Sequence, residues 1–227
     1  MKKTILFLIL ILSLINCEDK PEKNFYGIPN DDKDQFIAGL LLSNNARTTT
    51  NGTVIDSRTG LEWKKCTQGQ IYRANVNDCQ GNKNSAAPTV SPEIGRYGAE
   101  TYSYCDLEGN QCNSLSLPQM LRKEEMIRNK ATSALFDACD TDRTGGFNNW
   151  RVPTYPELKA LSELGKTALL INFPNTPDDF FWTSWGNEQD STGKTAKAIN
   201  FTIDRVGEET NLNKTARYYV RCVRNSN

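Results

Sequence analysis

The chain has 227 residues, with 27 basic and 27 acidic side chains and no histidine. Its balanced charge argues against a nucleic-acid binder, which would be markedly basic, and without histidine it lacks the commonest general base and metal ligand. One of its seven cysteines lies near the N-terminus and six lie in the body of the chain. Six body cysteines in a polar chain are typical of an exported, disulfide-stapled protein.

The N-terminus predicts a secretory signal followed by a lipid anchor. Met1-Lys2-Lys3 is basic, residues 5–15 are almost wholly apolar, and the run ends at Leu14-Ile15-Asn16-Cys17. Such a run is too short to span a bilayer comfortably. The cysteine directly after it resembles a lipobox, in which a bacterial signal peptidase cuts before the cysteine and the thiol carries diacylglycerol. Asn16 departs from the usual small residue, and the alternative is an ordinary signal peptide with a nearby free thiol.

We therefore predict a signal peptide over 1–16, lipidation of Cys17, and a mature protein anchored to a membrane rather than spanning it. Residues 17–49 are predicted to be the lipidated N-terminus and a tether, because 18–33 are charged and contain two prolines. The short apolar patch at 36–42 fits either a strand or a helical turn. A folded domain is expected over 50–227.

The predicted domain begins with a β-hairpin and then alternates loops, helices and strands. Thr53–Asp56 and Leu61–Trp63 are strand-like around a turn that contains Gly60. Residues 66–104 are rich in Asn, Gly, Ser and Pro and are expected to form a long stapled loop. Helices are predicted over 117–138 and from an N-cap at Thr154, with Glu157 completing a capping box, to Gly165. Three further strands are expected at 180–185, 198–203 and 217–224.

Four ordered motifs resemble those of a known bacterial family. They are Val54-x-Asp56-x-x-Thr59-Gly60-Leu61-x-Trp63, Cys139 followed by Trp150-Arg151-Val152-Pro153-Thr154-x-x-Glu157-Leu158, Phe181-Trp182-Thr183-Ser184 and Val220-Arg221-Cys222-Val223-Arg224. In order and spacing they are similar to the Lcl C-terminal domain, named after a collagen-like adhesin. The resemblance covers about residues 50 to 225 and includes a stapled insertion between Cys66 and Cys79.

The resemblance implies an α+β, C-type-lectin-like fold with small twisted antiparallel sheets, two helices and disulfide-stapled loops. Family members are mostly exported or surface-attached. The namesake assembles as a trimer and binds sulfated polysaccharide, whereas for most members no activity is known. The resemblance therefore sets a class of protein and not a ligand, and a homotrimer is one assembly that it suggests.

The six body cysteines allow several pairings. Cys66–Cys79 and Cys105–Cys112 are the local choices, and Cys139–Cys222 is the remaining pair, which the resemblance also suggests. The alternative is a Cys₄ zinc site, but the chain has no C-x-x-C pair and the predicted compartment is oxidising. We predict three disulfides and neither a metal nor a cofactor.

Several residues are candidates for ligand contact. Arg217, Tyr219 and Arg221 alternate along the predicted last strand and would share one face, where two guanidiniums beside an aromatic ring suit sulfate, carboxylate or sugar. The alternative is a solvated strand face. Trp63, Trp150 and Trp182 lie inside the family-like motifs and are expected in the core, which leaves Trp185 as the exposed aromatic candidate.

The remaining motifs favour binding over catalysis. Asp140-x-Asp142-x-Thr144-Gly145 resembles the start of a calcium loop, but Arg151 stands where a bidentate Glu is needed, so a solvated turn is favoured. A serine or cysteine nucleophile would lack a histidine base. We expect a non-catalytic domain on an outer-membrane, surface-exposed lipoprotein that adheres to host or matrix polysaccharide or protein. The alternatives are a structural envelope lipoprotein that binds another envelope component and a carboxylate-dependent hydrolase.

Overall fold

The computed structural model describes residues 46–49, 51–82, 97–105 and 133–226. The predicted signal peptide, Cys17, the apolar patch at 36–42 and residues 117–132 of the first predicted helix lie outside these ranges, as does Cys112. None of the helices in the described ranges combines the length and the apolar character needed to cross a bilayer.

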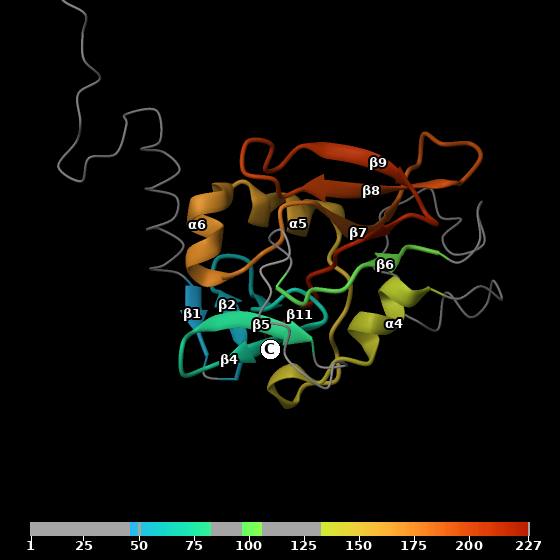
Figure 1. The fold of residues 1–227 in the computed structure, drawn as a ribbon. Helices are drawn as coiled ribbons and strands as arrows, with labels where there is room; N and C mark the ends of the chain where they lie inside the picture. Colours follow the sequence, from blue (N-terminus) through green and yellow to red (C-terminus); the bar gives the residue numbers. More distant parts are fainter. Residues whose placement is uncertain (1–45, 50, 83–96, 106–132, 227) are drawn as a thin grey trace, which may run out of the picture. The chain divides into compact units, whose positions relative to one another are not determined.

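The first sheet joins the two ends of the domain (Figure 1). It is antiparallel, with strand order β1-β2-β3-β11. The bounds are Ala46–Thr48 for β1, Thr53–Asp56 for β2, Leu61–Lys64 for β3 and Val223–Asn225 for β11. The predicted hairpin is confirmed: Gly60 has a φ of 67° and its N–H donates to the Asp56 carbonyl at 3.0 Å. Glycine reaches this left-handed conformation without the penalty of a Cβ.

The second sheet is an antiparallel meander of β7 (Phe180–Gly186), β8 (Thr195–Asn200) and β9 (Glu209–Asn213). The strand predicted at 180–185 is confirmed. The strand predicted at 198–203 is wrong in its position, because the chain leaves the sheet after Asn200 and turns back, with Gly207 N–H donating to the Asn200 carbonyl at 2.8 Å. Phe201 is buried although it lies beyond the strand, so its apolar side chain extended the apparent strand pattern.

Two small antiparallel pairs complete the β structure. In the region predicted as a loop, β4 (Gln70–Arg73) pairs with β5 (Asp78–Asn82), and β6 (Tyr102–Ser103) pairs with β10 (Arg217–Tyr218). The predicted strand over 217–224 is wrong as one continuous element. Its two ends pair in different sheets, and the segment between them is buried, with a bridge from Tyr219 to Phe181.

The helices agree only in part with the sequence predictions. Helix α4 (Ala134–Asp140) overlaps the end of the first predicted helix and is capped by Ser133. Helix α5 (Tyr155–Ser162) begins at Thr154 with the predicted capping box. The helix ends before Gly165, and the φ of 73° at this glycine breaks the right-handed backbone that continues through Leu164, which confirms Gly165 as the predicted stop. A further helix, α6 (Gly165–Asn172), begins at this glycine and was not predicted. A 3-10 turn, η3, covers Thr144–Gly146.

The core consists of two apolar clusters on opposite faces of the β7–β8–β9 sheet. Trp182 and Ala198 belong to one cluster, with α4 and Trp150, while Phe181 and Ile199 belong to the other, which includes apolar side chains of α5. Neighbouring residues of a strand point to opposite faces, so both faces are covered. Trp63, Trp150 and Trp182 are buried, which confirms their predicted place in the core. The fold is α+β with small antiparallel sheets, and its described ranges hold three α-helices rather than two.

Candidate functional site

Three residues predicted to form one ligand-binding face do not do so. Arg217 is exposed, whereas Tyr219 and Arg221 are 0% and 1% exposed. The prediction from alternating residues required a strand with one solvent-exposed face. Residues 219–222 instead run through the interior and are buried on both sides. The prediction of one anion-binding face is therefore wrong, because only Arg217 of the three residues lies at the surface.

Arg221 has a structural environment instead. Its guanidinium donates to the carbonyls of Lys64 and Lys65 and to the hydroxyls of Thr67 and Thr176, and it lies 4.7 Å from the centroid of the Phe173 ring. Within the described ranges, no carboxylate forms an ion pair with it. Arg221 thus links the segment after β3 to the loop after α6.

Trp185, the fourth sequence candidate, is half-buried near the end of β7. Its ring lies against Tyr155, with centroids 5.6 Å apart and planes inclined by 39°. The Lys197 ammonium lies 5.2 Å from the Tyr155 ring centroid and forms an ion pair with Glu209. Trp185, Tyr155, Lys197 and Glu209 form what we call the aromatic platform, and the sequence analysis identified only Trp185 among them.

Four elements build this platform. Tyr155 comes from the first turn of α5, Trp185 from β7, Lys197 from β8 and Glu209 from β9. A hydrogen bond to Glu209, together with burial, raises the pKa of Tyr155 to about 12. Burial raises the pKa of the Glu209 carboxyl, but Lys197 and Tyr155 outweigh this effect and lower it overall. The carboxylate is therefore ionised at neutral pH, and its charge offsets that of Lys197.

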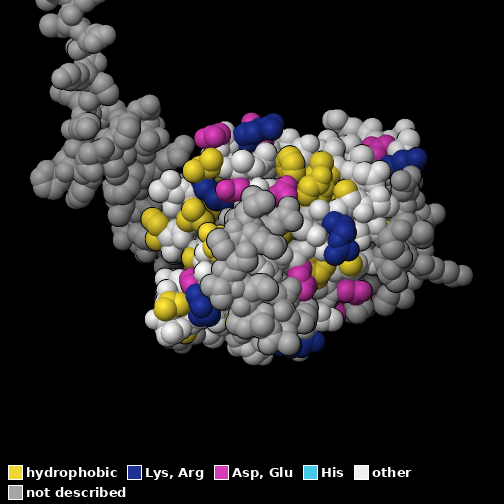
Figure 2. All heavy atoms as spheres, in the orientation of Figure 1, with side chains coloured by type: hydrophobic (Ala, Val, Ile, Leu, Met, Phe, Trp, Pro, Cys, Tyr) yellow, Lys and Arg dark blue, Asp and Glu magenta, His cyan; other side chains and the backbone are white. Residues whose placement is uncertain are grey.

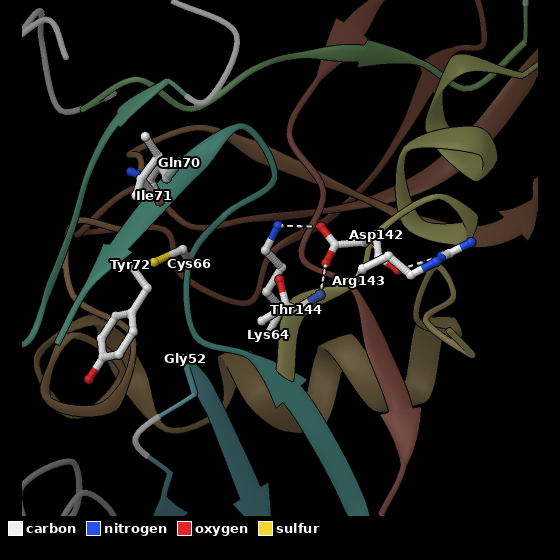
Figure 3. Close-up of a pocket in the computed structure, with 9 residues that line it drawn as sticks. All are labelled: Gly52, Lys64, Cys66, Gln70, Ile71, Tyr72, Asp142, Arg143 and Thr144. Carbon is white, nitrogen blue, oxygen red and sulfur yellow. Dashed lines mark hydrogen bonds and ion pairs between the residues drawn. The ribbon is translucent and has the colours of Figure 1, made fainter. Parts of the chain in front are cut away.

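A separate pocket of about 270 Å³ lies between the β4–β5 hairpin and η3 (Figure 3). In Figure 3, Cys66, Gln70 and Tyr72 lie on one side of this pocket, and Lys64 and Asp142 lie on the other. The Lys64 ammonium contacts the Asp142 carboxylate at 2.6 Å, and both side chains are almost fully buried. The second Asp142 oxygen accepts the Thr144 N–H at 2.7 Å.

This arrangement corrects the expectation for the calcium-like motif. Asp142 is neither in a solvated turn nor an open ligand, because Lys64 and the Thr144 backbone occupy its oxygens. Burial raises the pKa of Asp142, but the Lys64 charge and the hydrogen bonds outweigh it and bring the pKa down to about 2. The pocket wall is thus a closed ion pair that joins β3 to the loop after α4.

Acid is expected to weaken the fold through this pair. The Asp142 pKa is about 2 in the folded chain against an ordinary 3.8, so the folded state binds this proton less readily than the unfolded state. The stabilisation is complete above about pH 4 and is lost as the pH falls towards 2; the shift corresponds to about 2 kcal/mol. Urea unfolding from pH 6 to 2 should show this loss in the wild type and a flatter dependence in Asp142→Asn. Asp204→Asn, at an exposed position, is the control, and equal slopes in all three proteins would contradict the assignment.

A second pocket, of about 370 Å³, lies between the first hairpin and α5 and contains two carboxylates, Asp56 and Glu157. Each is held by an arginine: Arg58 donates to Asp56, and Arg151 donates to both oxygens of Glu157 at 2.7 and 2.8 Å. Burial raises both pKa values, but the arginine contacts outweigh it and lower them overall. A glycosidase acid needs a raised pKa, and neither of these two carboxyls has one.

The cysteines form the predicted staples wherever both partners are described. Cys66 pairs with Cys79, and Cys139 pairs with Cys222. Cys105 is also disulfide-bonded, and its predicted partner Cys112 lies outside the described residues. These sulfurs are therefore not zinc ligands. In the described part of the chain, no three cysteine or carboxylate side chains gather where they could share a metal ion.

The sequence was compared with models of known protein families. Residues 52–224 match the family model of the Lcl C-terminal domain. The chain belongs to the Lcl C-terminal domain family. The matched region begins just before β2 and ends in β11, so it contains all the elements described above except β1 and the last residue of β11. No curated protein sequence matches the chain.

The family-like motifs of this Lcl C-terminal domain build the frame rather than the platform. Trp63, Trp150 and Trp182 are in the core, Cys139 and Cys222 are bonded, and Arg151 pairs with Glu157. Tyr155 lies within the second motif, but at a position where the motif specifies no residue, and the other platform residues lie outside the motifs. The Lcl C-terminal domain is adhesin-associated and not known for catalysis, which supports an adhesin-like binding domain of an exported or surface protein.

Proposed function

We propose that this protein is an exported lipoprotein, anchored through acylated Cys17, whose Lcl C-terminal domain adheres to host or matrix polysaccharide or protein. The family match over residues 52–224 carries the proposal. The lipobox-like end of the apolar N-terminal run and the tether that follows it support an anchor in the outer membrane with the domain displayed on the surface.

The proposed fold type is C-type-lectin-like. Two features of the structure support it. The first and last parts of the domain meet in one sheet, where Val223 lies opposite Trp63, and the Cys139–Cys222 disulfide holds α4 to the final segment. Loops that carry contact residues can vary on such a frame without disturbing its core.

The anchor is tested by metabolic labelling with a palmitate analogue in cells that express the full-length protein. We expect the wild-type protein to incorporate label and to partition into detergent, and Cys17→Ala to do neither. Several acyl chains hold a protein firmly to a bilayer, at ~0.8 kcal/mol per buried CH₂ group. Equal labelling of the two proteins, or no labelling of the wild type, would refute the anchor.

The binding task is tested with the full-length lipoprotein in detergent on immobilised polysaccharides and matrix proteins. Saturable binding to at least one of them is expected, and uniformly blank surfaces would count against adhesion. Light scattering on the same sample reports whether the protein is the homotrimer that the family resemblance suggests.

The second candidate is a structural envelope role, in which the domain binds another envelope component. Its motivation is the same anchor, which would serve equally well inside the envelope. Protease treatment of intact cells distinguishes the two: rapid loss of the domain supports surface display, and protection supports the envelope role.

A further inference from the structure

We propose that the aromatic platform is a binding site for an uncharged glycan, with Trp185 stacking on a pyranose ring and Tyr155 holding Trp185 in place. This inference rests on the proposed function and names the site and the ligand class for it. The contacts, the hydrogen-bonding groups and the charges of the platform each support it.

The rings come first. Trp185 is the only half-buried tryptophan, since the side chains of Trp63, Trp150 and Trp182 are each at most 3% exposed. Its neighbour Tyr155 is also half-buried, and the inclined contact between the two rings keeps part of the indole at the surface. Tyrosine and tryptophan present an apolar face and a polar edge at the same time, which suits a sugar ring with apolar C–H faces and hydroxyl edges.

The Trp185 indole N–H is the second observation. Trp150 and Trp182 donate their indole N–H groups to backbone carbonyls at 3.0 and 2.8 Å. The corresponding group of Trp185 is buried without an acceptor. An unmade hydrogen bond is costly in a buried position, and a ligand hydroxyl that reached this N–H would supply the missing acceptor.

The charges select among glycans. Lys197 is paired with Glu209, and the nearby Lys159 donates to the Gly207 carbonyl at 2.7 Å. An anionic polysaccharide would need a cation free to pair with sulfate or carboxylate. Glu163 acts on Tyr155 together with Glu209, and Lys159 acts on Glu209 together with Lys197. Among the described residues, two lysines are thus balanced by two carboxylates, so the surface favours a ligand without charge.

The adjoining sheet face offers neutral hydrogen-bonding groups. Asn211 lies directly opposite Lys197 in the β8–β9 pair and is exposed. Residues opposite one another in an antiparallel pair share a face, so the Asn211 amide lies on the Lys197 side of the sheet. Figure 2 shows one face of the domain, where apolar side chains occur in separate groups among charged ones.

The test uses the full-length lipoprotein in detergent on an array that contains neutral and sulfated glycans. We expect binding to neutral glycans, and at least tenfold weaker binding for Trp185→Ala. Tyr155→Ala should weaken binding less, since Tyr155 positions the indole, and Trp185→Phe should retain part of it. Ile203→Ala, at an exposed position in the β8–β9 turn, is the matched control and should bind as the wild type does.

Acrylamide quenching of tryptophan fluorescence gives a readout that does not depend on a variant folding correctly. Because the other three tryptophans are buried, quenching reports chiefly on Trp185, and a bound neutral glycan should reduce it. Wild-type binding that is unchanged in Trp185→Ala would overturn the platform and leave the proposed adhesion intact. Binding confined to sulfated glycans would also overturn it, and binding to no polysaccharide or protein would overturn both.

Discussion

Replacing Cys139 and Cys222 together by alanine is expected to produce the larger of the two main losses of stability, about 4.5 kcal/mol in the free energy of unfolding. The bond joins residues 83 positions apart, and the entropy that a crosslink removes from the unfolded chain grows with the loop it closes. It also ties α4 to the buried segment before β11. Urea unfolding under oxidising conditions measures the loss.

The matched control is the double variant of Cys66 and Cys79. This disulfide closes a separation of only 13 residues, so the same entropy argument predicts about 3 kcal/mol. All four sulfur-bearing side chains are buried to a similar degree, which makes the loop length the main difference. A smaller loss for the Cys139 and Cys222 variant than for this control would contradict the entropic explanation.

Replacing Arg221 by methionine is expected to lower the free energy of unfolding by about 3 kcal/mol, because the Lys64 and Lys65 carbonyls and two threonine hydroxyls lose a buried donor. Burial lowers the pKa of Arg221. Its planar guanidinium donates hydrogen bonds to two separate segments of the chain at once. Arg221→Lys should not restore stability, because a single ammonium lacks that reach. Chemical unfolding of each variant gives the comparison.

Arg217→Met is the control for this prediction. Arg217 lies four residues earlier and is exposed, and surface substitutions usually change stability by no more than about 0.5 kcal/mol. Equal effects at the two positions would show that the buried network of Arg221 contributes little.

Local chemistry predicted several elements correctly. The β2–β3 hairpin follows from strand-like residues around a turn that needs the positive φ of Gly60, and the start of α5 follows from the Thr154–Glu157 capping box. Both depend on contacts between residues close in the sequence. The Cys66–Cys79 staple is local in the same sense, and Cys139–Cys222 was assigned as the remaining pair and by family resemblance.

Long-range packing explains the predictions that were wrong. Tyr219 and Arg221 were placed on a wet face by alternation, but alternation identifies a wet face only when one side of the strand is solvated. Gly165 stops α5 as expected, but the helix α6 that begins at this glycine was not predicted. The buried side chains of Leu169 and Phe173 then hold this helix against the core.

The candidate site was only partly accessible from sequence. Trp185 was identified because it stands just outside a motif, whereas Tyr155, Lys197 and Glu209 come from different elements and carry no shared spacing. The pattern of residues along a helix or strand predicts which side chains share a face of that element. It does not predict which side chains of four different elements lie together.

Motifs and strong apolar character were enough to predict the family, the Cys66–Cys79 and Cys139–Cys222 staples and the three core tryptophans, and these predictions are confirmed. The export signal stays a prediction. Three features became visible only in the folded chain: the burial of Arg221, the pairing of Asp142 with Lys64, and the contact of Trp185 with Tyr155 beside the Lys197–Glu209 ion pair. Burial and charge pairing depend on neighbours in space, and these neighbours lie up to 157 residues apart along the chain, as Lys64 and Arg221 do.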